Sequence, residues 1–264
     1  MADTERAADG TVGRTLAVLD LVAGFGRPVR FAEILPQSGL PKATLYRFLQ
    51  VLTRQDLLAH DPERQTYAPG MRLVRLAHAA WAQSSLAPLA QGVLDRLADA
   101  LGQTVHLAQL DNGAVLYVDK RNARQPVEMF SQSGRVGPAY CTGVGKAMLA
   151  WLPEKRLAEA LALQSFHRHT PHTLVTADAL RADLAQIRAR GFALDDEEHE
   201  PGIACLAAPI LSRAGRLLGA ISVTTTTAAT SRGQLLALAG PVMAAAAEIA
   251  SLAETWRFPE ARPA

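Results

Sequence analysis

Side chains that could do chemistry gather in two polar segments of the chain. Residues 195–200 form an acidic run, Asp-Asp-Glu-Glu-His-Glu, which Cys205 follows. A second segment contains His167, His169 and His172. Carboxylates and imidazoles are metal ligands, so the two segments could together serve a metal-dependent hydrolase. No pair has the spacing of a closed zinc site such as Cys-x2-Cys, and the alternative is two solvated loops without metal.

A glycine-rich loop, Gly143-Val144-Gly145-Lys146-Ala147, is a third place where chemistry is conceivable. A phosphate-binding loop requires Gly-x4-Gly-Lys-Ser/Thr, but Tyr140 stands at the first glycine and Ala147 at the hydroxyl that binds magnesium. This pattern excludes nucleotide hydrolysis. A glycine-rich loop that opens a helix still offers free backbone N–H groups, which suit a small carboxylate. The alternative is a tight turn between a strand and a helix.

A helix predicted to begin at Pro41 has two different faces. Its apolar residues Leu45, Phe48, Leu49 and Leu52 share one face. The opposite face is basic and polar and carries no acid, as expected of a helix that lies in the major groove of DNA. We expect bases to be read or phosphates to be held by Lys42, Ala43, Thr44, Tyr46, Arg47 and Gln50.

The segments around this helix predict a winged helix-turn-helix. One helix precedes it, with Val12, Leu16, Leu19 and Ala23 at helical spacing, and a short second helix is expected over 30–35. The turn Ser38-Gly-Leu-Pro leads into the third helix.

A β-hairpin is predicted after the third helix, where a wing would lie. Residues 57–60 and 65–68 flank its turn, Asp-Pro-Glu-Arg. We expect Arg14 and Arg64 to hold the DNA backbone. The alternative is a small three-helix domain with an ordinary solvated surface.

A separate helix is predicted over 71–84, with a stripe of small and apolar residues. A lone helix between two domains must cover such a stripe, and a second copy of itself is the simplest partner. The alternative is packing on its own domain. The stripe consists of Leu73, Leu76, Ala77, Ala80 and Ser84, bordered by Trp81.

The remaining two thirds of the chain predict a mainly antiparallel sheet with helices on its faces. The turn Asp111-Asn112-Gly113 is a strong hairpin signal, and a second hairpin surrounds 212–215. Strands are expected over 105–110, 114–118, 127–131, 203–211 and 217–223. Helices are expected over 88–101, 143–151, 154–163, about 180–190 and 234–256.

The composition is that of a soluble globular protein with a local basic region. The chain has 264 residues, 49% of them hydrophobic, and a net charge of +2. Residues 11–75 carry nine basic and five acidic side chains, so the rest of the chain is slightly acidic. Two cysteines are too few for a disulfide scaffold and fit a reducing compartment. The start lacks the apolar core of a signal peptide, and the longest uncharged stretch near the end, 235–247, is too short to span a membrane. We therefore expect a cytoplasmic protein without membrane association.

Four segments resemble the IclR family of bacterial transcriptional regulators, in register from about Val12 to Arg257. The segment 39–49, GLPKATLYRFL, resembles the recognition helix of that family. The others are 104–108, TVHLA; 141–147, CTGVGKA; and 195–205, DDEEHEPGIAC. The resemblance implies an α+β protein with a winged helix-turn-helix, a linker helix and a GAF-like effector-binding domain. The domains would be a disordered tail at 1–10, the DNA-binding domain at 11–70, the linker and dimerisation helix at 71–86 and the effector domain at 87–258.

The resemblance also implies an effector pocket and an oligomer. Family members are dimers, often paired into tetramers. Ser222 and Thr224 lie on the same face of a strand and correspond to pocket hydroxyls in relatives, although serine is common where Thr224 stands. The acids after Asp195 are expected in a solvated loop. The pocket residues implied are Gly143, Val144, Asp195, Cys205, Ser222 and Thr224.

The leading prediction is a ligand-responsive regulator that represses a catabolic operon, binds a pseudo-palindromic operator in double-stranded DNA and senses a small organic acid. The pocket contains no evident nucleophile–base pair, so we expect no catalysis, no metal and no cofactor. The metal-dependent hydrolase described above is one alternative. A constitutive DNA-binding dimer, whose C-terminal domain only forms oligomers, is the other.

Overall fold

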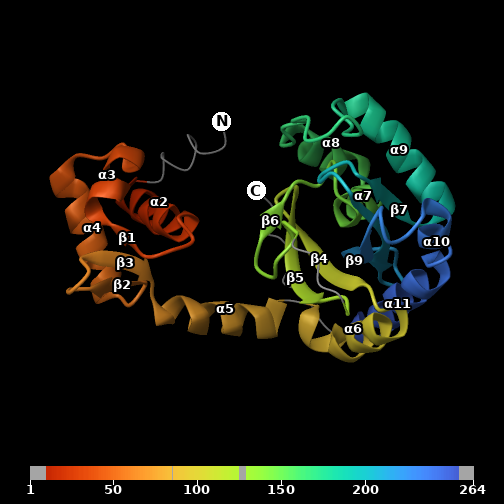
Figure 1. The fold of residues 1–264 in the computed structure, drawn as a ribbon, viewed down its shortest axis with the longest axis horizontal. Helices are drawn as coiled ribbons and strands as arrows, with labels where there is room; N and C mark the ends of the chain where they lie inside the picture. Colours follow the sequence, from red (N-terminus) through yellow and green to blue (C-terminus); the bar gives the residue numbers. More distant parts are fainter. Residues whose placement is uncertain (1–9, 85, 125–128, 256–264) are drawn as a thin grey trace. The chain divides into compact units, whose positions relative to one another are not determined.

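The computed structural model describes residues 10–84, 86–124 and 129–255 (Figure 1). The chain divides into two compact units, Met1–Ala80 and Trp81–Ala264. Each unit has its own core of buried apolar side chains. The predicted tail at 1–10 lies outside the described residues except for Gly10, which begins the first helix. The exact domain boundaries stay a prediction.

The N-terminal unit is a three-helix domain with a small antiparallel sheet, as the sequence predicts. Leu45, Phe48, Leu49 and Leu52 are at most 2% exposed, so the apolar face of the third helix forms the centre of this core. The strands lie in the order β1-β3-β2. The helices are α2 (Gly10–Gly24), α3 (Phe31–Ser38) and α4 (Lys42–Arg54), and the strands are β1 (Val29–Arg30), β2 (Leu58–Asp61) and β3 (Thr66–Pro69).

Two details of this unit differ from the sequence prediction. The first helix buries Val18, Leu19 and Val22, whereas Val12 is 72% exposed and Leu16 48% exposed. Of the predicted stripe only Leu19 is buried, and the buried face is rotated around the helix to include Val18 and Val22, because the helix carries apolar residues on more than one side. The second difference is strand β1, which was not predicted, since two residues that pair with distant β3 leave no local pattern.

Helix α5 (Met71–Ser84) has the bounds that its helical pattern predicts, within the linker expected over 71–86. Much of its apolar surface is uncovered, with Met71 at 73%, Val74 at 58% and Leu76 at 52% exposure. Leu73 packs against the N-terminal core and Trp81 against a core of the C-terminal unit. The alternative that the whole stripe packs on its own domain is therefore wrong for Leu76.

The C-terminal unit is built on one six-stranded sheet in the order β6-β5-β4-β9-β8-β7, and all its pairings are antiparallel. The prediction of a mainly antiparallel sheet is confirmed. The two predicted hairpins form its β4–β5 and β8–β9 pairs. The strands are β4 (Thr104–Asp111), β5 (Ala114–Arg121), β6 (Val136–Gly137), β7 (Ala193–Asp196), β8 (Ile203–Leu211) and β9 (Leu217–Thr226).

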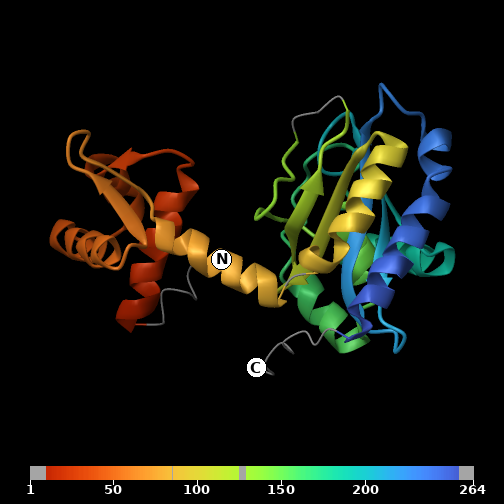
Figure 2. The same cartoon turned by 90° about the horizontal axis from the view of Figure 1, so that it is seen from below.

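Helices cover both faces of this sheet (Figure 2). Alternate residues of β8 separate the two sides: Leu206 and Ala208 face one core, and Cys205 and Ala207 face the other. The first core is closed by α6 (Ala87–Leu101), α10 (Arg232–Leu236) and α11 (Ala239–Leu252), and the second by α7 (Gly143–Leu149), α8 (Glu154–Ala162) and α9 (Ala177–Arg190).

Three predictions for this unit are corrected. The strand expected over 127–131 falls partly outside the described residues, and 129–131 are not extended in the sheet; the strand is β6 instead. Strand β7 was not predicted, because only four residues pair with β8. The single helix expected over 234–256 is two helices, α10 and α11, followed by a short 3-10 turn, η1 (Ala253–Thr255).

One helical stretch, Arg232–Leu252 with a mean hydropathy of 1.8, is long and apolar enough to cross a membrane by length and composition. Core helices of soluble proteins meet the same criterion. Here the stretch is broken after Leu236, and Val242, Ala246 and Ile249 are buried in the core against the sheet. Its apolar character is explained by this packing.

Candidate ligand cavity and nucleic-acid interface

Strand register brings most of the predicted pocket residues into one row. Asp195 pairs with Cys205, Cys205 with Thr224 and Thr224 with Thr104, across four neighbouring strands. Directly opposed residues of an antiparallel sheet project to the same face. In the next row on that face, Ser222 pairs with His106. The sheet therefore presents a carboxyl, a thiol, several hydroxyls and an imidazole side by side.

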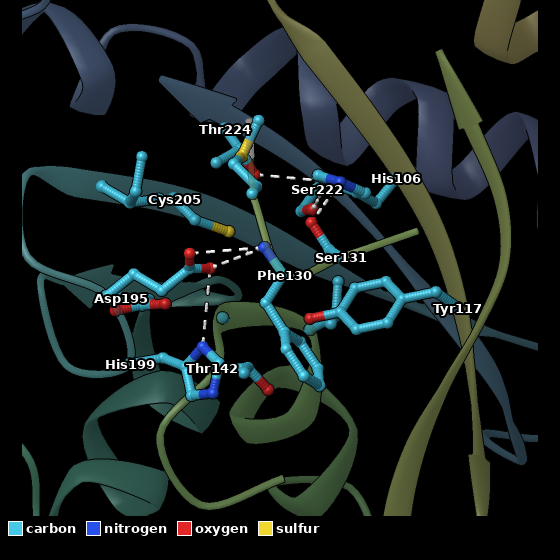
Figure 3. A pocket seen from close by; sticks show the side chains of 15 residues that line it. His106, Tyr117, Phe130, Ser131, Thr142, Asp195, His199, Cys205, Ser222 and Thr224 are labelled. Atoms are coloured by element: carbon cyan, nitrogen blue, oxygen red, sulfur yellow. Dashed lines mark hydrogen bonds and ion pairs between the residues drawn. The ribbon is translucent and has the colours of Figure 1, made fainter. Parts of the chain in front are cut away.

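A cavity lies over these rows, and helix α7 borders it (Figure 3). All six residues predicted for the effector pocket line it: Gly143, Val144, Asp195, Cys205, Ser222 and Thr224. Its volume is about 30 Å³, room for about two water molecules. The residues that complete its lining are His106, Tyr117, Met129, Phe130, Ser131, Thr142, His199, Glu200 and Ile203.

Helix α7 lies directly on strand β8 because it begins with glycine. A Cβ atom on Gly143 would stand 2.6 Å from Sγ of Cys205. The N-cap residue Thr142 gives the helix no side-chain cap, since its hydroxyl donates to the Pro138 carbonyl at 2.7 Å. Backbone N–H groups in the first turn of a helix need partners from outside the helix. Those of Gly143 and Val144 are therefore uncharged donors at the cavity wall.

His106 is a buried, neutral imidazole in this wall. Its Nε2 lies 2.8 Å from the Ser131 hydroxyl, and its Nδ1 lies 3.3 Å from Thr224 and 3.5 Å from Ser222 (Figure 3). Burial, together with the charge of Lys120, lowers the pKa of His106 to about 3. The ring therefore offers one N–H donor and one acceptor at neutral pH.

Asp195 is the most unusual group of the cavity. The residue is only 6% exposed, and its Oδ1 accepts a hydrogen bond from the backbone N–H of Glu198 at 2.8 Å. Burial raises the pKa of Asp195 to about 7, and the neighbouring carboxylate of Glu198 adds to this shift. The carboxyl is thus balanced between its neutral and charged forms at physiological pH.

Lys146 fixes the position of α7 through ion pairs with two carboxylates. Its side chain is 2% exposed, and Nζ donates to Oδ2 of Asp183 on α9 at 2.8 Å and to Oε1 of Glu198. Burial opposes the charge, but attraction to Glu198 and Asp183 outweighs it and raises the pKa of Lys146. The expectation that the acids after Asp195 lie in a solvated loop is wrong for Glu198, which is 7% exposed.

Glu200 lines the cavity and fastens the segment around Phe130. Its carboxylate accepts the Phe130 N–H at 3.2 Å and lies 3.6 Å from Nδ1 of His199. The His199 side chain lowers the pKa of Glu200 despite partial burial. The Phe130 ring contacts the His199 ring at 5.2 Å. Glu200 lies in the loop that the sequence predicted, but it is half-buried and lines the cavity.

The metal hypothesis finds no support in the geometry. His167 and His169 lie with their ring centres 5.0 Å apart, and His169 lies 4.8 Å from His199. Among the residues that the structure describes, however, no group of three or more His, Cys, Asp or Glu is placed to hold a metal ion. These imidazoles instead pack with Tyr140 and Phe130.

Both cysteines are buried, free thiols. Burial raises the pKa of Cys141 and of Cys205 to about 12, so neither is a thiolate nucleophile at neutral pH. Cys205 lines the cavity, whereas Cys141 packs in the core beside it.

The face of α4 opposite the core carries the six residues predicted to contact DNA, and their role stays a prediction. Lys42, Ala43, Tyr46 and Arg47 are exposed, and Thr44 and Gln50 are half-buried. The Arg47 guanidinium lies 5.5 Å from the centre of the Phe48 ring. This is a cation–π contact of the charged group itself, and the Arg47 side chain remains exposed.

The two predicted backbone contacts occupy other elements of the N-terminal unit. Arg14 is exposed on α2. Arg64 is at the tip of the β2–β3 hairpin with its side chain 80% exposed. Asp61 shapes this tip by accepting the N–H groups of Glu63 and Arg64 at 2.9 and 3.1 Å. Exposed basic side chains thus lie on α2, on α4 and at the hairpin tip of one small domain.

Comparison with known proteins identifies the architecture. A family model described as IclR helix-turn-helix domain matches residues 11–62, and one described as bacterial transcriptional regulator IclR C-terminal matches residues 78–251. The chain belongs to the IclR family. The helix-turn-helix with its β2–β3 wing is therefore the DNA-binding domain of an IclR-family transcriptional regulator.

Relatives of this IclR-family protein are transcriptional regulators rather than enzymes. The HTH-type regulator XynR of Escherichia coli is 34% identical over 82% of this chain and 86% of its own length. The acetate operon repressor of Salmonella typhimurium is 29% identical over 89% of this chain and 87% of its own length.

Solved IclR structures share the fold. Thermotoga maritima IclR has a TM-score of 0.74 and 26% identity, covering 92% of this chain and 98% of its own. An IclR homologue of Microbacterium hydrocarbonoxydans, solved in complex with 4-hydroxybenzoate, has a TM-score of 0.79 at 20% identity, with the same coverage.

Several cavity residues were not predicted from the sequence. His106 stands two residues after Thr104 in a motif that was recognised, and period-two alternation with the β4–β9 pairing could have placed it beside Ser222. Phe130 and Ser131 left no such signal, because an irregular segment carries no periodicity. Their positions depend on contacts with Glu200 and His106.

Proposed function

We propose that this IclR-family protein is a ligand-responsive repressor of a catabolic operon, released from its operator by a small organic acid. The observation that supports the proposal is the convergence of the six predicted effector residues on one buried, polar cavity. A solved relative with the same fold binds 4-hydroxybenzoate, and repressors occur among the relatives.

The effector would be held by uncharged donors. Uncharged groups at the cavity wall can donate hydrogen bonds to a carboxylate or a hydroxyl of the ligand. They are the hydroxyls of Ser222 and Thr224 and the first-turn N–H groups of Gly143 and Val144. Since the cavity measures only about 30 Å³, an organic acid needs side chains at its wall to move. Binding would therefore favour a rearranged state of this domain, which is the condition for an allosteric signal.

In DNA binding, two copies would place their α4 helices in successive major grooves of a pseudo-palindromic operator. We infer a cytoplasmic homodimer, with a dimer of dimers as the larger assembly. A ligand changes operator affinity only through its different affinity for the two states, typically by about 1–3 kcal/mol.

The DNA-binding assignment is tested with Arg47→Ala. Loss of one cationic contact per subunit is expected to weaken binding to promoter DNA flanking the gene by roughly 5- to 100-fold, measured by fluorescence anisotropy at physiological salt. Arg213→Ala is the matched control, because Arg213 is 85% exposed in the other unit. Unchanged affinity of a folded Arg47→Ala protein would remove α4 from the interface.

The effector assignment is tested by adding small carboxylic acids to the protein–DNA complex and to the free protein. A specific acid is expected to raise the melting temperature of the free protein and to lower its operator affinity. If acids stabilise the protein but leave operator affinity unchanged, the constitutive DNA-binding dimer is the better description. If no acid does either, the effector proposal fails.

A further inference from the structure

The charges that line the cavity raise a question about how it accepts an anion. Two carboxylates, Asp195 and Glu200, belong to the lining. Among the described residues, the lining contains no lysine or arginine. A ligand carboxylate would therefore meet negative charge in a cavity with little water, where like charges repel more strongly than in bulk solvent.

The negative charge of Glu200 is compensated by groups around it. Its carboxylate lies beside the His199 imidazole, accepts the Phe130 N–H and is near the Lys120 ammonium group. These partners stabilise the ionised form of Glu200 and leave it charged when a ligand enters. The neighbouring carboxyl, Asp195, also accepts one backbone N–H, but burial is the largest influence on its pKa.

Among the described residues, no ion pair is formed by Asp195, although the charges of Lys146 and His199 oppose the rise of its pKa. Within the described part of the chain, its only hydrogen bond is the one that Oδ1 accepts from Glu198 N–H. The ammonium group of Lys146 lowers the pKa of Asp195 through its charge, but its ion pairs are with Glu198 and Asp183. The other titratable groups around Asp195 are the Cys205 thiol on β8, the Cys141 thiol before α7, the Tyr117 phenol on β5 and the His199 ring. The two thiols and the phenol are neutral at physiological pH, because burial raises the pKa of each.

A neutral Asp195 resolves this conflict. Protonated, its carboxyl becomes an O–H donor in the same row as the Cys205 thiol and the Thr224 hydroxyl. The cavity wall then offers donors and no unpaired negative charge to an anion. Burial, which already raises the pKa of Asp195 to about 7, makes protonation accessible under physiological conditions.

We propose that Asp195 binds the effector as a neutral carboxylic acid, so that the cavity takes a singly charged carboxylate together with one proton and discriminates against dianions. This inference rests on the proposed effector function of the cavity. Asp195 is then the residue that determines which ligand charge is accepted.

The proposal predicts the direction of the pH dependence. Asp195 must be protonated in the complex, so affinity for a monocarboxylate is fully present below pH 7 and falls as pH rises above it. For a group that titrates near pH 7, affinity is expected to fall about tenfold between pH 6 and pH 8. Binding should take up nearly one proton at pH 8 and almost none at pH 6.

The experiment uses the full-length protein and acids whose own charge is constant between pH 6 and pH 8. The monoanions are 4-hydroxybenzoate, lactate and oxamate, and the dianions terephthalate and oxalate are matched to the first and last. Thermal shift identifies the acids that bind at millimolar concentration. Calorimetry in buffers of different ionisation enthalpy then gives affinity and proton uptake at each pH.

Two variants test whether Asp195 is the group responsible for the pH dependence of binding. Asp195→Asn replaces the carboxyl by a neutral amide donor, so the tenfold pH dependence and the proton uptake should disappear. Asp196→Asn is the matched control, because Asp196 is exposed on the same strand and is absent from the cavity lining. It should keep the pH dependence of the unmodified protein.

The results of these measurements distinguish a failure of the Asp195 proposal from a failure of the effector function on which it rests. If no acid of the panel binds at pH 6, both the inference and the effector proposal are overturned. If an acid binds with an affinity that is constant or increases with pH, only the inference fails. Two further results would overturn the inference about Asp195. One is equal binding of oxamate and oxalate, and the other is a tenfold pH dependence that persists in Asp195→Asn.

Discussion

Lys146 illustrates how a single residue of this protein can be read in two ways. In the sequence it follows a glycine-rich loop and resembles the lysine of a phosphate site. In the structure it is 2% exposed and bound by Asp183 and Glu198. Because Glu198 N–H also donates to Asp195, this lysine supports the segment that positions a cavity residue. Its role is to hold elements together rather than to bind phosphate.

Lys146→Met should therefore be strongly destabilising. It leaves the buried carboxylate of Glu198 without its cation, whereas Asp183 keeps Arg190 at 3.7 Å. Breaking a buried ion pair typically costs about 3–5 kcal/mol. The measurement is chemical denaturation at pH 7, with Lys155→Met on the exposed surface of α8 as the control. Adding Glu198→Gln to Lys146→Met should recover part of the loss. Equal stability of the Lys146 and Lys155 variants would contradict this account.

The position of helix α7 depends on two glycines, which have no side chains. Gly143 allows it to approach β8, and Gly145 allows it to approach the preceding chain, where a Cβ would stand 2.4 Å from the Ala139 carbonyl oxygen. The helix has only seven residues, so its position depends on these contacts more than on helix propensity. The same approach brings the first-turn N–H groups to the cavity wall.

Gly143→Ala is expected to push α7 away from β8 and to lower the stability of the unit by about 1–3 kcal/mol. Thermal and chemical denaturation measure this loss. Gly233→Ala is a suitable control, since a Cβ there meets nothing within 4 Å. A Gly143 variant as stable as this control would show that the backbone can move aside without cost.

The whole molecule consists of two units with different surfaces. The N-terminal unit carries the basic face of α4, and the C-terminal unit contains the polar cavity. Helix α5 belongs to both units in the chain and exposes Met71, Val74 and Leu76. Of these, Leu76 lies on the stripe that the sequence predicts as a contact with a second copy, and an uncovered apolar side chain there fits such a contact. A second copy of the same helix is the partner that we propose.

Leu76→Glu should then weaken self-association, because a charge would be buried in the contact between the two copies. Analytical ultracentrifugation is expected to show a larger fraction of monomer, and operator affinity should fall with it. Leu163→Glu is the control at another exposed leucine, 64% accessible at the C-terminal end of α8. If both variants associate equally well, this part of α5 is not the dimer contact.

The sequence by itself determined the elements whose signals are local. The third helix was predicted because Leu45, Phe48, Leu49 and Leu52 repeat at helical spacing, and the β4–β5 hairpin because Asn112-Gly113 favours its turn. Membership of the cavity was predicted for six residues by resemblance, since their motifs are characteristic of the family.

Only the tertiary structure decided which other groups meet there and in what state. His106 reaches Ser222 through the pairing of β4 with β9 and reaches Ser131 through an irregular segment, and both contacts join residues far apart in the chain. Likewise, Glu198 was expected in a solvated loop but is buried against Lys146. Burial and charge partners depend on residues far apart in the chain. For this reason the protonation of Asp195, and with it the proposed choice of ligand charge, could not be predicted from spacing alone.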